Sequence, residues 1–405
     1  MTTPDWAQVR ASFPGLEDKV FLDAACVSIA PRQARDAVVD FVDAVVRMPE
    51  ADATRHHLLL DEGRRGARSE VAALIGASAD EIALVESTSH GLSLLANGLP
   101  ISGGENIVLC DLEYVGVVAP WAARARESGI DLRFVRNREG RIEIDDVART
   151  IDDNTRAICL SSVQWSNGYR IDLTSLSALA RDRGIFLVLD AIQQIGAIRL
   201  DVRETPVDAI ACGGHKWLNA PFGCGFLYVR REILPDVRPS LSGYLNLVPP
   251  PEGWGRYFAT PDITPLRRYE FATTAQKLDS GGTSNYPGSY GLAASLRLIN
   301  GIGAPAIEER IHTLADRLFE GLLGAGFRLV SHREREHRSG IITFTAAGDA
   351  ALDGRIVQRL RERHVCISQR YTSRVGGLRV SVHFFNNEDD IDTLVREAVR
   401  ARDAG

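Results

Sequence analysis

A lysine stands directly after a histidine at the end of an apolar run in the segment DAIACGGHKWLNAPFGCGFLYVR (208–230). Lys and Arg total 47 residues, yet lysine occurs only at positions 19, 216 and 277. Arginine therefore supplies positive charge almost everywhere else. A remaining lysine points to chemistry that arginine cannot do, which is to lose a proton and attack a carbonyl group. We interpret Lys216 as this nucleophilic amine, although a lysine at a strand end is ordinarily a solvated charge.

A carboxylate closes a second apolar run, in LVLDAIQQIG (187–196), where Gln193 follows Asp190 by about one helical turn. Such an aspartate could simply cap a helix. Facing a pyridine nitrogen, it would instead keep the ring protonated and able to accept electrons. Asp190 and Lys216 are predicted to lie on neighbouring strands of one sheet, as a shared ligand requires.

Three small hydroxyl residues, Ser87, Thr88 and Ser89, stand between a predicted strand and a predicted helix. Side chains of this kind are good helix N-caps. The same position is also an anion site, because free backbone N–H groups and the helix dipole favour a phosphate there.

Short apolar runs separated by segments of helical period indicate the fold class. Seven predicted strands lie at 82–87, 106–111, 131–137, 157–163, 186–192, 208–214 and 225–230. Predicted helices lie at 32–47, 60–75, 117–127 and 174–184. Near-continuous apolar strands alternating with helices predict an α/β fold with a mainly parallel sheet covered on both faces, where ligands bind beyond the carboxyl ends of the strands.

The 405 residues are enough for a large and a small domain. We predict an N-terminal arm at 1–18 that packs with the small domain, a large domain at 19–291, and a small α+β domain at 292–405. The segment 231–290 is rich in Pro, Gly and aromatic residues and is predicted to be a lid or an interface. Its aromatic side chains are Tyr244, Trp254, Tyr257 and Phe258.

Composition excludes several classes of protein. The net charge of −6 argues against a nucleic-acid surface. No apolar run approaches the roughly 20 residues that a membrane span needs, and the start lacks a signal-peptide core, so a cytoplasmic location is expected. The six cysteines form no CxxC pair and match no zinc pattern, so we predict no metal site and reduced, mostly buried thiols.

The ordered motifs resemble those of the class V aminotransferase superfamily of fold type I pyridoxal-5′-phosphate (PLP) enzymes, and the resemblance spans nearly the whole chain. These enzymes include cysteine desulfurases, selenocysteine lyases and kynureninases. The matching segments are STS (87–89), EYVGVVAPW (113–121), SNG (166–168), DAIQ (190–193), HK (215–216), GGTSN (281–285) and RVSVHFFNNEDDID (379–392).

The resemblance implies that PLP is the cofactor and assigns its contacts. Lys216 would hold PLP as a Schiff base, and Asp190 would pair with the pyridine nitrogen. Gln193 would bond the phenolic oxygen, and Tyr114 would stack on the ring. The residues that would bind the phosphate are His215, Thr88 and Ser89.

Three further residues complete the implied site. Asn167 matches an asparagine near the phenolic oxygen and the substrate. Thr283 matches a residue that reaches the phosphate of a neighbouring subunit, which implies a homodimer with composite sites. Arg379 matches the arginine that binds the substrate α-carboxylate, and its planar fork suits that bidentate contact.

The sequence departs from the family in two places. Gly213 stands three residues before the lysine, where a hydroxyl side chain is common, so one phosphate contact is predicted to be missing. Desulfurases also carry a nucleophilic cysteine in the loop before the carboxylate-binding arginine, whereas here this loop reads RYTSRVGGL (370–378). Cys366 falls inside a predicted strand. Because a persulfide mechanism needs a mobile, exposed thiolate, the sequence argues against a cysteine desulfurase.

The residues predict one common first step, in which Lys216 removes the α-proton of an amino-acid substrate. Related proteins without the thiol favour a C–S lyase acting on an S-substituted cysteine, as in some natural-product pathways. Transamination, epimerisation and decarboxylation with deamination stay open as alternatives. A non-catalytic PLP-binding protein has no need of Lys216, Asp190 and Arg379 together, and no GxGxxG supports a Rossmann dehydrogenase.

Overall fold

Seven strands form the large sheet of the computed structural model, which describes residues 4–404. Their order is β2-β8-β7-β6-β5-β3-β4; β8 runs antiparallel to β2 and β7, and the other pairs are parallel. The bounds are β2 Ile82–Val85, β3 Asn106–Cys110, β4 Asp131–Val135, β5 Thr155–Ser161, β6 Phe186–Asp190, β7 Ala209–Gly213 and β8 Gly225–Val229. Each strand overlaps one predicted run, so the prediction of a mainly parallel seven-stranded sheet is confirmed.

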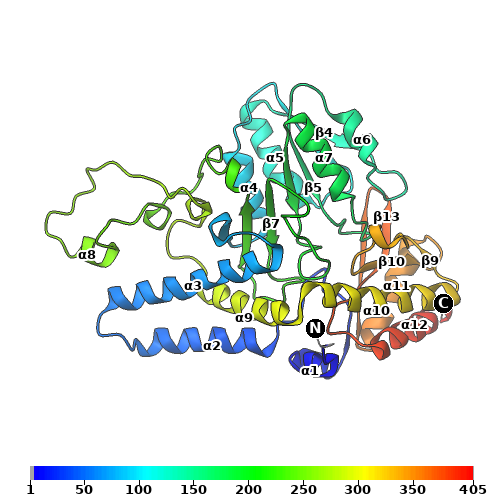
Figure 1. Ribbon diagram of the computed structural model, residues 1–405. Helices are drawn as coiled ribbons and strands as arrows, with labels where there is room; N and C mark the ends of the chain where they lie inside the picture. Colours follow the sequence, from blue (N-terminus) through cyan, green and yellow to red (C-terminus); the bar gives the residue numbers. More distant parts are fainter. Residues whose placement is uncertain (1–3, 405) are drawn as a thin grey trace.

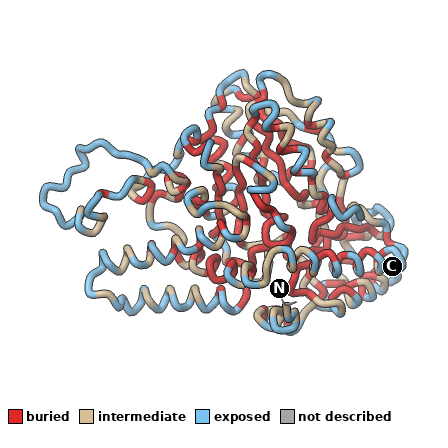
Figure 2. Tube along the Cα trace, in the orientation of Figure 1, coloured by how far each residue is buried: buried red, intermediate tan, exposed pale blue. Residues whose placement is uncertain are grey.

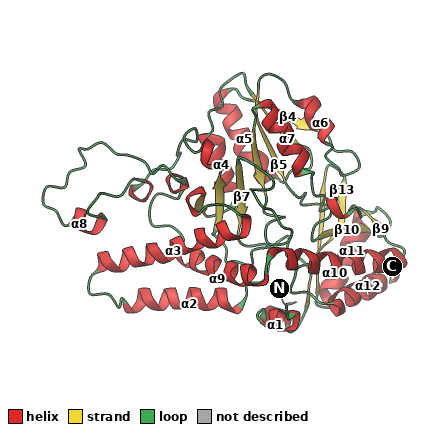
Figure 3. Ribbon diagram, viewed as in Figure 1, coloured by secondary structure: helices red, strands yellow, loops and turns green. Residues whose placement is uncertain are grey.

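Helices cover both faces of this sheet (Figures 1 and 3). Alternation along β6 explains why: Leu187 and Leu189 belong to one buried cluster and Val188 to another. The first cluster includes side chains of α7 and of two long helices, α3 (Ala53–Ile75) and α9 (Tyr286–Ile302), and the second includes side chains of α4 and α5. Helices of this part are α4 Thr88–Gly98, α5 Val115–Ser128, α6 Ile144–Thr150 and α7 Leu173–Arg183.

Three long helices pack together beside the sheet. They are α2 Arg32–Arg47, α3 Ala53–Ile75 and α9 Tyr286–Ile302. The predicted helix at 32–47 is confirmed with both its ends. The predicted helix at 60–75 is the second part of α3, which begins earlier because Asp52 caps it by accepting a hydrogen bond from the N–H of Arg55.

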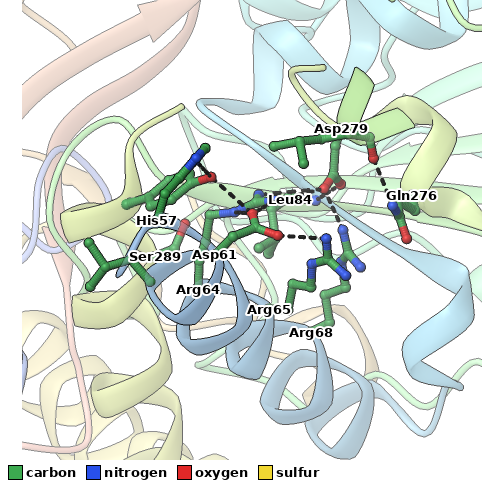
Figure 4. A network of polar contacts seen from close by, with 12 residues as sticks. His57, Asp61, Arg64, Arg65, Arg68, Leu84, Gln276, Asp279 and Ser289 are labelled. Carbon is green, nitrogen blue, oxygen red and sulfur yellow. Dashed lines mark hydrogen bonds and ion pairs between the residues drawn. The ribbon is translucent and has the colours of Figure 1, made fainter. Parts of the chain in front are cut away.

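A buried network of charges joins α3 to the chain segment that precedes α9 (Figure 4). Asp279 accepts hydrogen bonds from Arg64, from Arg68 and, at 2.9 Å, from the N–H of Leu84 in β2. Arg64 also donates to Asp61 at 3.1 Å. Both Arg64 and Asp279 are 2% exposed, so each charge depends on the other for compensation. The network therefore fixes the start of the GGTSN segment (281–285) against α3 and β2.

The C-terminal part contains an antiparallel sheet of order β12-β13-β10-β9 with helices packed on it. Its elements are α10 Ala304–Gly324, β9 Arg328–Leu329, β10 Ile341–Thr345, α11 Ala350–Glu362, β12 Ser368–Thr372, β13 Val375–Ser381 and α12 Glu388–Asp403. A separate pair joins β1 Val20–Phe21 to β11 Val365–Cys366. The predicted strand VCISQR is thus divided between two sheets. Domain boundaries at 18 and 291 stay a proposal.

The N-terminal helix α1 Trp6–Ala11 contacts the C-terminal part. Arg10 donates to Asp390 at 2.8 Å, and Phe13 packs on the rings of Phe384 and Phe385. Residues 1–3 of the predicted arm lie outside the described residues.

The segment between β8 and α9 projects away from the large sheet (Figure 1) and is widely exposed between about 240 and 272 (Figure 2). Tyr244 packs on Trp254 and Phe258 of the short helix α8 Trp254–Phe258, and Tyr257 packs on the same two rings. None of these rings lines the cavity described below. Among residues 4–404, no helix is both long and apolar enough to cross a bilayer.

Candidate active site

A cavity of about 330 Å³ opens at the carboxyl ends of β5, β6 and β7. Parallel α/β sheets bind ligands at this edge. The cavity is lined by Ala25, Cys26, Ser87, Thr88, Ser89, Tyr114, Gly116, Ser161, Trp165, Asp190, Ile192, Gln193, His215, Lys216, Arg370 and Arg379. Eight of the predicted site residues are therefore brought together.

Lys216 is the one lysine of the chain that lines this cavity. Lys19 instead lies 3.7 Å from Asp18, and Lys277 is buried with its ammonium group bonded to the carbonyl of Leu234. Burial lowers the pKa of Lys216 to about 8, with the charge of Arg379 adding to the effect and Asp190 opposing it. About a tenth of the amine is thus neutral at pH 7 and able to attack an aldehyde, far more than for a lysine of ordinary pKa.

This lowered pKa predicts the pH dependence of cofactor capture. Only the neutral amine attacks an aldehyde, so the rate at which the cofactor-free protein takes up PLP should rise about tenfold per pH unit below 8 and level off above it. An amine with its ordinary pKa of 10.5 would give a rate that still climbs at pH 9 to 10. Stopped-flow absorbance of PLP uptake across this range separates the two cases.

Asp190 ends β6 with its side chain buried and facing the cavity. Its Oδ1 accepts the N–H of Ile192 at 2.9 Å. Burial raises the pKa of Asp190 to about 6, while the N–H of Ile192 and the charge of Lys216 limit the rise. A protonated pyridine nitrogen would add to the counter-charge that Lys216 gives this buried carboxylate.

The start of α4 borders the cavity at the place where the anion site is predicted. Ser87 caps the helix by accepting the N–H of His90 at 3.1 Å, and Ser89 is exposed on the cavity side. Thr88 is buried, and its Oγ1 accepts the N–H of Gly213 at 2.9 Å. A side chain at 213 would place its Cβ 3.2 Å from that oxygen, so the glycine leaves room for the threonine hydroxyl.

His215 and Gln193 flank the lysine loop. The His215 ring stacks on Phe222 with ring centres 5.5 Å apart, and burial lowers its pKa. The amide of Gln193 accepts from Nε1 of Trp217 at 2.8 Å and donates to the carbonyl of Ala25 at 3.1 Å. One N–H of the amide remains available for the phenolic oxygen predicted to lie here.

Tyr114 stands at the mouth of the cavity, 48% exposed, with its ring centre 5.9 Å from Nζ of Lys216. It also packs edge-on against Trp165 at 5.4 Å. The neighbouring Glu113, which the sequence did not single out, fixes this turn by accepting the N–H of Ser161 at 2.8 Å. Burial raises the pKa of Glu113 to about 7, against the effect of the Ser161 hydrogen bonds.

Two predicted site residues do not line the cavity. Asn167 is fully buried; its amide donates to the carbonyl of Gly140 at 2.8 Å and accepts the N–H of Tyr169 at 3.1 Å. Both ends of this side chain are thus committed to the backbone. Thr283 is exposed in the loop before α9. Its predicted contact with a neighbouring subunit stays a prediction.

Arg379 projects from β13 and is 1% exposed. It donates to Asp23 at 3.2 Å and to the carbonyl of Trp165 at 2.9 Å, while its Nε has no partner in the described part of the chain. Burial lowers its pKa, with Asp23 acting in the opposite direction. The guanidinium is held rigidly at the cavity wall, as recognition of a carboxylate requires.

The segment 370–378 was predicted to be a loop, and this prediction is wrong. Most of the segment belongs to a β-hairpin formed by β12 and β13. Thr372 pairs with Val375, so the turn consists of Ser373 and Arg374, with φ of 45° and 67°. Two residues with positive φ match the right-handed twist of the flanking strands. Arg370 of this hairpin lines the cavity, which sequence reasoning missed.

Cys26 is a second cavity residue that was not among the predicted site residues. Its Sγ lies 3.5 Å from Nη2 of Arg370. The expectation of buried cysteines holds for Cys110, Cys159, Cys212 and Cys224, whereas Cys26 and Cys366 are half-buried. The sequence signal that could have identified Cys26 is its position directly after the segment FLDAA (21–25).

The site fits PLP. At the edge of a seven-stranded α/β sheet it brings together an amine of lowered pKa, a buried carboxyl group and a helix N-terminus with hydroxyl side chains. Together they define a PLP-dependent enzyme that acts on an amino-acid substrate. The family model described as aminotransferase class-V matches residues 20–394, and the chain belongs to this family.

Similar proteins cover the whole length of the chain. A probable cysteine desulfurase 2 of Mycobacterium leprae is 29% identical over 100% of this chain and 98% of its own. The cysteine desulfurase of Thermococcus onnurineus NA1 has a TM-score of 0.85 with 24% identity, over 100% of this chain and 99% of its own. The cystine C–S lyase C-DES, solved with its product cysteine persulfide, has a TM-score of 0.85 with 23% identity, over 96% and 99%.

Proposed function

We propose that the chain is a C–S lyase, which eliminates a thiol from an S-substituted cysteine and supplies the released thiol to a natural-product pathway. The observation that carries the proposal is the hairpin at 370–378, a tight turn without cysteine where desulfurases carry a mobile thiol loop. Because this hairpin offers no thiol to capture the substrate sulfur, the sulfur would leave as a thiolate. The same fold hosts this chemistry in C-DES, which is named a cystine C–S lyase.

The roles of this chain's residues follow from their positions. Arg379 and the cavity wall would hold the α-carboxylate, and the amine of Lys216 would take the proton from Cα. PLP, when bound, supplies the electron sink next to Cα, and Asp190 keeps that sink positively charged. The Cβ–S bond then breaks with its electron pair on sulfur, and Lys216 can return the proton to the thiolate. The remaining three-carbon enamine hydrolyses to pyruvate and ammonium.

A second candidate function, cysteine desulfurization, is favoured by one observation. Cys26 lines the cavity with its Sγ 3.5 Å from Nη2 of Arg370, so a thiol faces the space where a substrate would bind. A thiolate at Cys26 would attack the sulfur of free cysteine, become a persulfide and leave alanine after proton return. Cys26 lies outside the hairpin, so this route would need a thiol position different from that of the desulfurases.

An assay without any keto-acid acceptor tests the proposal. Supplied with S-substituted cysteines, the purified holoenzyme should release pyruvate and free thiol in equal amounts, and Cys26→Ala should do the same, because Lys216 performs both proton transfers. Alanine as product, with one added sulfur atom on Cys26 by mass spectrometry, would establish desulfurization instead. Turnover that begins only on adding a keto acid would establish transamination.

We also propose a homodimer in the cytoplasm, with each subunit completing the other's site. Thr283 lies outside its own cavity, which supports a contact across an interface. The exposed side of α2 carries Val39, Val42 and Val46, and Leu266 of the projecting segment is 89% exposed. Apolar side chains grouped at such exposure are typical of subunit interfaces.

A further inference from the structure

Two arginines line the same cavity, and their surroundings differ. The charge of Arg379 is opposed by Asp23. Arg370 has no carboxylate within ion-pair distance among residues 4–404. Its Nη1 donates to the carbonyl of Gln369 at 2.8 Å, and its Nη2 reaches only the sulfur of Cys26, at 3.5 Å.

The hairpin fixes both guanidinium groups on one face. Ser368 pairs with Arg379 across β12 and β13, and Arg370 lies two residues along β12 from Ser368. Residues two apart on a strand, and residues paired across strands, point to the same side of a sheet. The second arginine is therefore displaced from the first along the same face of the hairpin, and both line the cavity.

A half-buried positive charge without a counter-ion is costly, and a ligand that brings a negative charge recovers that cost. We propose that Arg370 binds a second carboxylate, at the far end of the sulfur substituent, so that the substrates are S-substituted cysteines with a carboxylate-bearing substituent. This inference rests on the proposed lyase function and names its substrate class.

A matched pair of substrates isolates this contact. S-carboxymethyl-L-cysteine and S-carbamoylmethyl-L-cysteine have the same shape and differ in charge. The wild-type holoenzyme should prefer the carboxylate about 10- to 100-fold in kcat/KM, as expected for a charge-assisted pair in a partly desolvated site. Arg370→Met should bring the ratio to within about threefold of unity, mainly through KM. An unchanged ratio in Arg370→Met overturns the inference.

Charge reversal and two controls sharpen the result. Arg370→Glu should prefer S-(2-aminoethyl)-L-cysteine over the carboxymethyl compound, which a merely structural role would not produce. Arg355→Met removes an exposed arginine of α11, which packs on the hairpin, and should keep the wild-type ratio. Cys26→Ala should also keep the wild-type ratio. If this variant lost the preference for the carboxylate, Arg370 would act through the thiol, and the proposal of direct carboxylate binding by Arg370 would be wrong.

Binding separates this inference from the proposed function. If neither compound releases a thiol, the lyase proposal fails, yet calorimetric dissociation constants for the two compounds still report on Arg370. Tighter binding of the carboxylate in the wild type, lost in Arg370→Met, supports the second anion site. Equal affinities in both proteins refute it.

Discussion

Lys216→Ala should lose the absorbance of covalently bound PLP and at least about 10³-fold in turnover, because one side chain supplies both the covalent link and the base. No other lysine lines the cavity, and the remaining two are engaged elsewhere, so no neighbouring amine can replace it. Absorbance spectra after PLP addition and steady-state rates with one S-substituted cysteine measure the two losses. The loss in rate should persist at saturating PLP, since the missing base is not restored by cofactor.

Lys19→Ala is the matched control, since it removes a lysine that pairs with Asp18 near the surface. Its spectrum and rate should match those of the wild type. A Lys216→Ala protein that keeps the covalent spectrum would place the cofactor link on another residue, and the description of the cavity as a PLP site would then be wrong.

The fold was predictable because most strands of the large sheet are buried on both faces. A strand such as β6, with Leu187 and Leu189 on one side and Val188 on the other, must be apolar throughout, and the sequence reveals it as a continuous run. The composition isolated Lys216 in the same way, since a chain so rich in arginine retains very few lysines. These are local signals, and the structure places the residues that carry them at one sheet edge.

The sequence gives no such local pattern for residues that reach the cavity only through contacts between distant segments. Cys26 follows a strand of two residues, and its place in the cavity depends on a hairpin more than 340 positions further on. The turn of that hairpin is made by Ser373 and Arg374 rather than by Asn or Gly, so its sequence is not typical of a tight turn. Arg370 was consequently assigned to a loop and not to a binding surface.

The residues of the cavity also explain why removal of the α-proton can be assigned to particular side chains more readily than the later departure of the leaving group. In the proposed mechanism, Lys216, Asp190 and Arg379 act on atoms common to every amino acid, and their positions are fixed by strand ends and buried hydrogen bonds. Tyr114, Trp165 and Arg370 also line the cavity, and we propose that they discriminate among leaving groups. A comparison of substrates with different sulfur substituents tests this proposal.

Arg379→Ala should weaken amino-acid binding by about 100-fold and leave PLP loading intact. A bidentate guanidinium–carboxylate contact in a desolvated site contributes about 1.5–3 kcal/mol, and removal of Arg379 also leaves Asp23 uncompensated and facing the incoming carboxylate. Titration of the cofactor absorbance with a substrate amino acid gives the dissociation constant, and the bound PLP content gives the loading.

Arg379 is buried and bonded to the carbonyl of Trp165, so its removal could also disturb the cavity wall. Arg379→Lys serves as the control, because it keeps the positive charge beside Asp23 and loses the planar fork. We expect it to fall between the wild type and Arg379→Ala in substrate affinity, with normal loading. If both variants lost PLP as severely as they lost substrate, the arginine would be a structural support of the cofactor pocket and the α-carboxylate would have to bind elsewhere, with Arg370 as the remaining cation on that wall.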